Sequence, residues 1–194
     1  MRKPANFETV KTGGFVPITP GGHHLIVKHI LETQSQKSGK DMIVVSFDMA
    51  PNDSQAGYFQ KEYAADTKTD KKWPIKGRQY IMLDDNDGNC SKSYKTFITS
   101  IEDSNPGFKV NWDADYMQFR GKKIGGVFGE AEYEKRDGGI GKTVELRWFR
   151  GDASVTEEPA PALKQLRNRQ TTTGTSDGFM NIPDNVDGDD LPFI

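Results

Sequence analysis

The feature that most constrains the fold is a series of short β-type segments separated by polar turns. Residues 24–32 and 42–49 are rich in Ile, Val, Leu and Phe, and they flank a polar loop at 34–40 that contains Ser38-Gly39. In the second segment, the apolar residues that alternate are Ile43, Val45, Phe47 and Met49. Two β-rich runs around a short loop with Gly predict a β-hairpin.

Further along, the pattern predicts one helix among three more strands. A short strand is expected at 79–83, and Ser91 or Ser93 can cap a helix that runs to about Asp103. Tyr94, Phe97, Ile98 and Ile101 share one face of that helix, and Asn105-Pro106-Gly107 ends it. A strand is expected within 123–134, a loop at 135–142 and a last strand at 143–150. Residues 51–78 are expected to be irregular, because Pro and Gly recur in them.

The order of these elements is strand, strand, strand, helix, strand, strand. This order predicts a mainly β fold: a five-stranded, OB-fold-like Greek-key barrel with one helix between strands 3 and 4. In the last strand, Val144, Leu146 and Trp148 are expected to face the core, opposite Glu145, Arg147 and Phe149. An open α+β sheet would have the same order of elements and remains an alternative.

Charge divides the chain into a body and a tail. Residues 1–150 hold 23 Lys and Arg against 20 Asp and Glu, whereas residues 151–194 hold 3 against 8. From Asp177 onward there are five acidic residues and no Lys or Arg, a composition typical of disordered segments. We therefore expect a folded domain at 1–150, followed by a flexible linker and a disordered acidic tail at 151–194.

Motifs for catalysis, metals or nucleotides fail on inspection. The segment 138–143 (GGIGKT) ends like a P-loop, but Arg136 stands where that loop needs its first Gly. The His23, His24 and His29 group lacks nearby carboxylate or Cys partners, so solvated or capping histidines are expected. The acidic run at 84–88 departs from the calcium-loop pattern, and the single cysteine, Cys90, excludes a disulfide framework. We expect no enzyme, no metal and no cofactor, although plentiful carboxylates leave a metal-dependent nuclease as an alternative.

Aromatic residues interleaved with basic ones are the strongest functional signal in the body. Single strands are held by a cationic groove and by aromatic rings on which bases stack. Lysines in or near the loops of the two hairpins fit this chemistry, as do the aromatic and basic residues around the third strand. The candidate nucleic-acid-binding residues are Lys37, Lys40, Tyr58, Phe59, Lys61, Lys71, Lys72, Trp73, Arg78, Tyr80, Lys142, Arg147 and Phe149.

The last residues form an acidic tip that ends in apolar side chains. Asp187, Asp189 and Asp190 precede Leu191, Pro192 and Phe193. The tip resembles that of bacterial single-stranded DNA-binding proteins, which end in Asp residues, an aliphatic residue, Pro and Phe. The resemblance covers seven or eight residues and implies docking of replication and recombination enzymes. Those proteins usually end at the Phe, whereas Ile194 follows here.

The body is similar to proteins from the replication modules of Gram-positive phages and prophages. The similar stretches lie at 38–42, 97–108, 121–123 and 128–133. The resemblance implies non-sequence-specific binding and protection of single-stranded DNA in phage replication or recombination, within the cytoplasm of a bacterial host cell. The chain has no apolar run long enough for a membrane helix, so no membrane partner is expected, and a homo-oligomer is left open. The near-neutral body favours an alternative, an OB-fold adaptor or inhibitor of replication or recombination enzymes.

Overall fold

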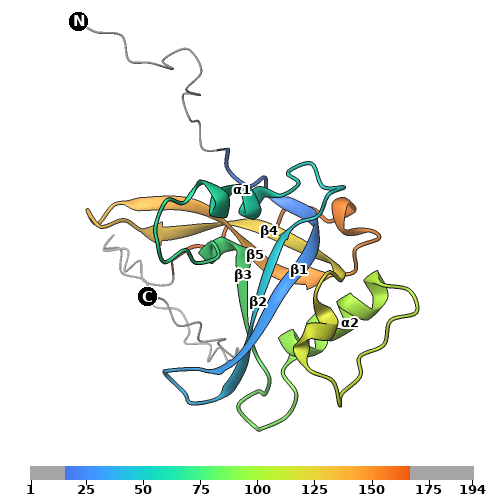
Figure 1. Cartoon of the computed structure of the whole chain (residues 1–194). Helices are drawn as coiled ribbons and strands as arrows, with labels where there is room; N and C mark the ends of the chain where they lie inside the picture. The colour runs from blue at the N-terminus through green and yellow to red at the C-terminus, as the bar shows by residue number, and fades with distance from the viewer. Residues whose placement is uncertain (1–15, 167–194) are drawn as a thin grey trace, which may run out of the picture.

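The computed structural model describes residues 16–166, which form one five-stranded antiparallel sheet with two α-helices (Figure 1). The strands lie in the order β3-β2-β1-β4-β5, and the sheet is open, with β3 and β5 at its edges. The prediction of a mainly β chain with five strands and a helix between the third and the fourth is confirmed. The strands are β1 (Gly21–Gln34), β2 (Asp41–Met49), β3 (Arg78–Met82), β4 (Lys123–Glu134) and β5 (Ile140–Arg150).

The long strand β1 joins the two halves of the sheet. Its residues 21–26 pair with β4, and its residues 25–34 pair with β2. Lys28 is an extra residue in a bulge between Val27 and His29. A bulge bends its strand and increases the local twist. The β1–β2 and β4–β5 hairpins accordingly project in different directions from the shared strand (Figure 1).

The core lies between the inner face of the sheet and α2 (Lys92–Ser104). The side chain of Ser91 accepts a hydrogen bond from the N–H of Tyr94 at 3.1 Å, so the predicted cap is confirmed. Phe97, Ile98 and Ile101 are buried as predicted, and Tyr94 packs against the core at its margin. The other main core side chains come from the strands and from the segment before β4: Leu25, Val27, Ile43, Phe47, Ile81, Phe119, Ile124, Phe128 and Phe149.

A second helix, α1 (Tyr58–Ala65), interrupts the segment that the sequence predicted to be irregular. It starts after Gly57, which has φ of 68° and no side chain to cap the helix. The buried carboxylate of Asp48 on β2 takes that role, because its Oδ1 accepts the N–H of Phe59 at 2.9 Å. Lys28 Nζ lies 4.0 Å from the other oxygen of this carboxylate. The cap of α1 is therefore supplied by tertiary structure.

Residues 151–166 pack back onto the sheet, which corrects the prediction of a flexible linker starting at 151. Val155 is fully buried in a 3-10 turn at Val155–Glu157. Further on, Lys164 pairs with β4 through two backbone hydrogen bonds of 2.9 Å, to Glu130 and Glu132. Residues in the range 151–166 thus belong to the packed part of the chain.

A bulge in β5 overturns part of the predicted alternation. Val127 of β4 pairs with Trp148, but the next residue, Phe128, pairs with Leu146, so Arg147 is the extra residue. Leu146 and Phe149 are buried on the core side, whereas Trp148 is exposed. The prediction that Trp148 faces the core was wrong, because one inserted residue reverses the direction of every later side chain. Among the described residues, neither helix has the length and apolar character needed to cross a bilayer.

Candidate nucleic-acid interface

The surface that gathers the most suitable side chains is the outer face of β1, β2 and β3. Directly paired residues of antiparallel strands project to the same side of a sheet. Ile43 and Val45 point into the core. The residues of β2 that alternate with them therefore point outward, as do the residues of β1 and β3 with which these pair. We call this surface the outer face and define it by three cross-strand rows: Leu31, Val44 and Tyr80; His29, Ser46 and Arg78; Thr33, Met42 and Met82.

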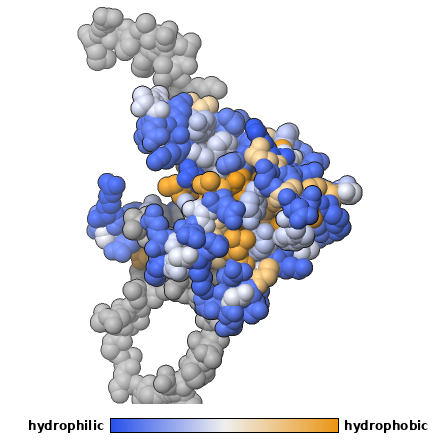
Figure 2. Space-filling view, turned by 60° about the horizontal axis from the view of Figure 1, so that its bottom comes forward, coloured by the Kyte–Doolittle hydropathy of each residue, from blue (hydrophilic) through white to orange (hydrophobic). Residues whose placement is uncertain are grey.

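The outer face combines exposed apolar side chains with basic ones. Leu31 is 55% exposed and Tyr80 is 40% exposed, and both pair with Val44, whereas Met42 in the third row is buried. Arg78 adds a positive charge, and His29 adds an exposed imidazole ring. None of its nine residues is acidic. Figure 2 shows how apolar residues interrupt an otherwise hydrophilic surface on one side of the molecule.

A second aromatic group adjoins this face where β3 begins. The Trp73 and Tyr63 rings lie 5.7 Å apart, and Lys71 Nζ lies 5.8 Å from the centre of the Tyr63 ring. The indole N–H of Trp73 donates to the carbonyls of Phe47 and Gly77, at 3.1 Å each. Arg78 in turn donates to the Trp73 carbonyl. These bonds hold Trp73 beside Arg78, where β3 begins, and Tyr80 follows two residues later on the same strand.

Several predicted basic residues are engaged in contacts of their own. Lys40 Nζ donates to the carbonyl of Asp85 at 2.7 Å and so fastens the 84–90 turn. Lys61 donates to the Ala56 carbonyl at 2.8 Å, and Lys72 lies 3.5 Å from Asp70. On the other hairpin, Lys142 lies 3.8 Å from Glu130, and Arg147 lies 3.1 Å from Glu145. Lys37 is exposed in the β1–β2 turn. The structure does not bring this set of residues together in one groove.

Three of the predicted aromatic residues serve the core and its margin. Phe59 and Phe149 are buried, and both rings contact that of Phe47 edge-on. Tyr58 is partly buried, and its hydroxyl donates to the Val16 carbonyl at 2.9 Å. A buried ring offers no face to a base, so Phe59 and Phe149 are core residues and their assignment to the interface is corrected. Leu31, Val44 and Met82 were missed, because they belong to the face only through strand register.

The histidines of β1 are not solvated, with the exception of His29. His23 is buried, and its Nδ1 lies 3.0 Å from Asp53 Oδ1 while its Nε2 lies 2.8 Å from the Thr19 carbonyl oxygen. Burial by itself lowers the pKa of His23, but these two hydrogen bonds outweigh it and raise the pKa above 6.5. The expectation of solvated or capping histidines was therefore wrong for His23.

The same contacts act on Asp53 in the opposite sense. Burial alone raises the pKa of this carboxyl, but the hydrogen bonds from His23 and from the Gln55 N–H lower it below its ordinary value. The neighbouring His24 lies 2.7 Å from Asp152 Oδ1. Among residues 16–166, no group of three or more His, Cys, Asp and Glu side chains is placed to hold a metal ion. Cys90 is exposed.

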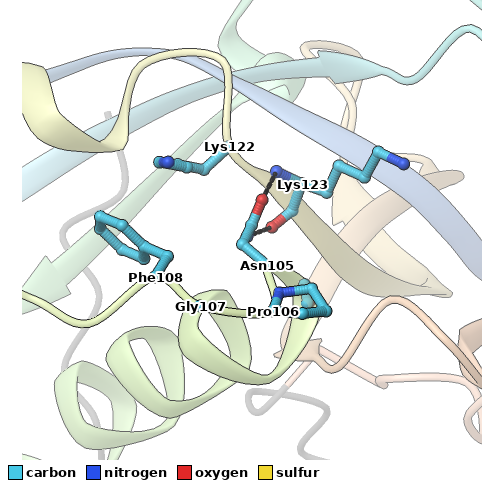
Figure 3. Close-up of a pocket in the computed structure, with 7 residues that line it drawn as sticks. Asn105, Pro106, Gly107, Phe108, Lys122 and Lys123 are labelled. Atoms are coloured by element: carbon cyan, nitrogen blue, oxygen red, sulfur yellow. Dashed lines mark hydrogen bonds between the residues drawn. The ribbon is translucent and has the colours of Figure 1, made fainter.

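A basic hollow of about 480 Å³ lies beside the end of α2 (Figure 3). The side chain of Asn105 fixes its wall by accepting the N–H of Lys123 at 3.1 Å and donating to the carbonyl of the same residue at 2.8 Å. Lys122 Nζ lies 4.2 Å from the centre of the Phe108 ring, which it covers. The amide of Asn105 is thus engaged within the protein, where it joins the end of α2 to the start of β4.

The predicted docking residues Asp187, Asp189, Asp190, Leu191, Pro192 and Phe193 lie outside the described residues. In the described part of the chain, the outer face brings the exposed ring of Tyr80 onto the same surface as Arg78. Comparison with known proteins adds no assignment: no protein-family model matches this chain, and no curated protein matches it.

Proposed function

We propose that the chain binds single-stranded DNA without sequence preference, through the outer face of β1, β2 and β3. The observation that carries this proposal is the composition of that face: exposed Leu31 and Tyr80 with Arg78 beside them, and no carboxylate among its nine residues. Every base has a π-face, so stacking on Tyr80 would not select a sequence. Arg78 would contact the backbone phosphates or stack beside the ring.

The arrangement of the strands supports the proposal. The order β3-β2-β1-β4-β5, with α2 between β3 and β4, is the order of an OB fold that would close if β3 met β5. OB folds bind oligonucleotides on the face of strands 2 and 3, between the loops of the first and last hairpins. The outer face includes those two strands here. We infer an open, OB-like sheet as the scaffold of the interface.

The direct test is titration with a dT oligonucleotide, monitored by fluorescence anisotropy of a labelled strand. We expect Tyr80→Leu to weaken binding by about 5- to 150-fold, since a stacked base contributes about 1–3 kcal/mol. Leu keeps an apolar side chain on the edge strand, so the sheet should persist. Trp112→Leu is the matched control, because Trp112 is also exposed but lies in the loop before β4. Equal affinities of the wild type and Tyr80→Leu would contradict the proposed face.

Salt dependence tests the electrostatic part of the same proposal. The logarithm of the affinity should fall with the logarithm of the salt concentration, with a slope of about −0.7 for each phosphate contact. Arg78→Gln should make that slope shallower by about one contact. A slope near zero would mean that the face does not bind a polyanion.

One observation favours a second candidate, a protein-binding module. Arg78 is the only Lys or Arg among the nine residues of the outer face, whereas Leu31, Met42, Val44, Tyr80 and Met82 are apolar or aromatic, so the face is more apolar than cationic. The apolar row of Leu31, Val44 and Tyr80 also suits a protein partner. Failure of the chain to bind dT at low salt, together with capture of a replication or recombination enzyme through the outer face, would favour this adaptor function. Docking of such enzymes by the acidic tip is a separate part of the proposal, testable by deleting residues 187–194.

A further inference from the structure

The inference concerns a cleft on the other side of β1, between its end, α2 and the loop before β4. The cleft has a volume of about 260 Å³. That is below the ~300–1,000 Å³ typical of pockets for drug-sized ligands, so it suits a single head group or side chain. Its lining includes four aromatic and two acidic residues: Tyr94, Trp112, Tyr116, Phe119, Glu32 and Asp115. We call this cleft the aromatic cage.

The four aromatic residues of the cage become more exposed from the core towards the surface. Phe119 is buried and Tyr116 and Tyr94 are partly buried, whereas Trp112 is 70% exposed. The Tyr116 and Phe119 rings lie 6.0 Å apart with an angle of 32° between their planes. Trp112 therefore contributes little to packing in the free protein. Its indole ring is available to something that enters the cage.

Hydrogen bonds hold the loop that carries the cage in place. The side chain of Gln118 accepts the N–H of Asn111 and donates to the Asn111 carbonyl, at 2.9 Å each. The carboxylate of Asp115 accepts the N–H of Met117 at 2.9 Å and caps the turn at Tyr116–Phe119. The loop that carries the cage is thus held in place before a ligand binds, so a ligand would have to order only the exposed Trp112 ring.

The charged residues that line the cage are all acidic. Glu32 and Asp115 are exposed at its edge, and no Lys or Arg is among its lining residues. Within residues 16–166, the Glu32 carboxylate has neither a hydrogen-bond partner nor an ion-pair partner. Burial, a hydrogen bond with Tyr94 and then the negative charge of Glu32 raise the pKa of Tyr116. The negative charge of Glu32 therefore reaches the Tyr116 side chain inside the cage, and the phenol of Tyr116 stays neutral.

We propose that the aromatic cage binds an organic cation, an ammonium or guanidinium group. The negative faces of aromatic rings attract cations within about 6 Å, and several rings with a nearby carboxylate form the usual site for alkylammonium groups. An anion such as phosphate is disfavoured by Glu32 and Asp115. A neutral apolar group would fill the volume but would leave Glu32 without a counter-charge. The cation can be a Lys or Arg side chain of a partner protein or a free quaternary ammonium, and both share this chemistry.

The cage lies apart from the outer face, so the inference does not depend on DNA binding. Glu32 pairs with Ile43, which points into the core, whereas its neighbour Leu31 pairs with Val44 on the outer face. Successive residues of a strand point to opposite sides of the sheet. Failure of one proposal therefore leaves the other untouched.

The experiment is an NMR titration of the full chain, following the indole N–H signal of Trp112. Choline is compared with 3,3-dimethylbutan-1-ol, which has the same shape but no charge. We expect choline to give a saturable shift of the Trp112 signal, with a dissociation constant on the order of millimolar, and the neutral alcohol to bind at least about threefold more weakly. N-acetyl-lysine amide and N-acetyl-arginine amide are then titrated in the same way to identify the preferred source of the cation.

Two variants complete the test. Glu32→Gln should weaken choline binding by about two- to fivefold and reduce its dependence on salt, with Asp115 left as the remaining acidic residue of the lining. Trp112→Leu, observed through the Tyr116 ring signals, should weaken it by a similar factor. Trp148→Leu is the control, because Trp148 is exposed on β5 and outside the cage. Equal binding of choline and the alcohol, or unchanged choline binding in both cage variants, would overturn the proposal.

Discussion

The buried pair of His23 and Asp53 gives the protein a stability that depends on pH in a defined way. Their side chains are 4% and 3% exposed, and both ring nitrogens of His23 face oxygen atoms that accept hydrogen bonds. Only an imidazolium ring donates from both nitrogens. These contacts favour the imidazolium form, so the pKa of His23 is raised and the ring binds its proton more tightly in the folded state than in the unfolded chain.

The sign of the pH dependence follows from the two pKa shifts. The pKa of His23 is raised, so its contribution is complete below about 6.5, the pKa in the unfolded chain, and is lost as pH rises through the folded-state pKa. The pKa of Asp53 is lowered, so its contribution is present above about 3.9 and is lost as pH falls through its folded-state pKa. The pair therefore stabilises most between about pH 4 and 6.5. Above pH 6.5, the loss of the His23 contribution lowers the free energy of unfolding by at most about 1.4 kcal/mol per pH unit.

Asp53→Asn tests this reasoning with little change in shape. The carboxylate accepts three N–H groups, from the His23 ring, the His24 backbone and the Gln55 backbone. An amide has a single acceptor oxygen, so at least one buried donor loses its partner and the charge pair is broken. We expect a loss of about 2–4 kcal/mol at pH 6, between the cost of an unsatisfied buried donor and that of a broken buried ion pair.

The assay is urea unfolding of both proteins from pH 4 to pH 9, with the His23 pKa followed by NMR. The difference between wild type and Asp53→Asn should shrink above pH 6.5, as the wild type loses the proton on His23. His29→Gln is the control, because His29 is an exposed histidine of the same strand. A His23 pKa below 6.5, or a difference in stability that does not change with pH, would refute the assignment of an imidazolium.

Two further predictions concern the contacts that hold the periphery of the fold. Asp48→Ala removes the cap of α1 and should cost about 1–2 kcal/mol, seen as faster hydrogen exchange in Tyr58–Ala65 with little change in α2. Gly22→Ala would place a Cβ 1.5 Å from the carbonyl oxygen of Val155, so the segment after β5 should detach and become sensitive to limited proteolysis. Gly39→Ala, which meets no atom within 4 Å, should leave that segment protected.

Most strands and α2 could be predicted from the sequence because their signals are local. The stripe of Phe97, Ile98 and Ile101 and the cap at Ser91 lie within a few residues of one another. By contrast, α1 has only eight residues, and Asp48, its cap, lies ten positions before the helix begins. No sequence pattern within residues 58–65 predicts that helix, because its cap comes from a residue that is distant in the sequence.

The candidate site was only partly predictable for a related reason. Tyr80 and Arg78 are visible as an aromatic and a basic residue in one strand, but Leu31 joins them only through two strand pairings. Those pairings depend on the bulge at Lys28, and the bulge at Arg147 likewise exchanged the roles of Trp148 and Phe149. A single inserted residue has no signature in composition or period, yet it decides which ring is exposed.

The alternation of β1 also determines how the two proposed sites relate. Leu31 belongs to the outer face, which has no carboxylate, and Glu32 belongs to the aromatic cage, which has no basic lining residue. A polyanion and a cationic group would therefore occupy opposite sides of the same strand without competing. Because the sites share neither side chains nor counter-charges, their binding free energies should add within about 0.5 kcal/mol. Coupling well beyond that value would mean that β1 shifts on binding, and its bulge at Lys28 is where such a shift would begin.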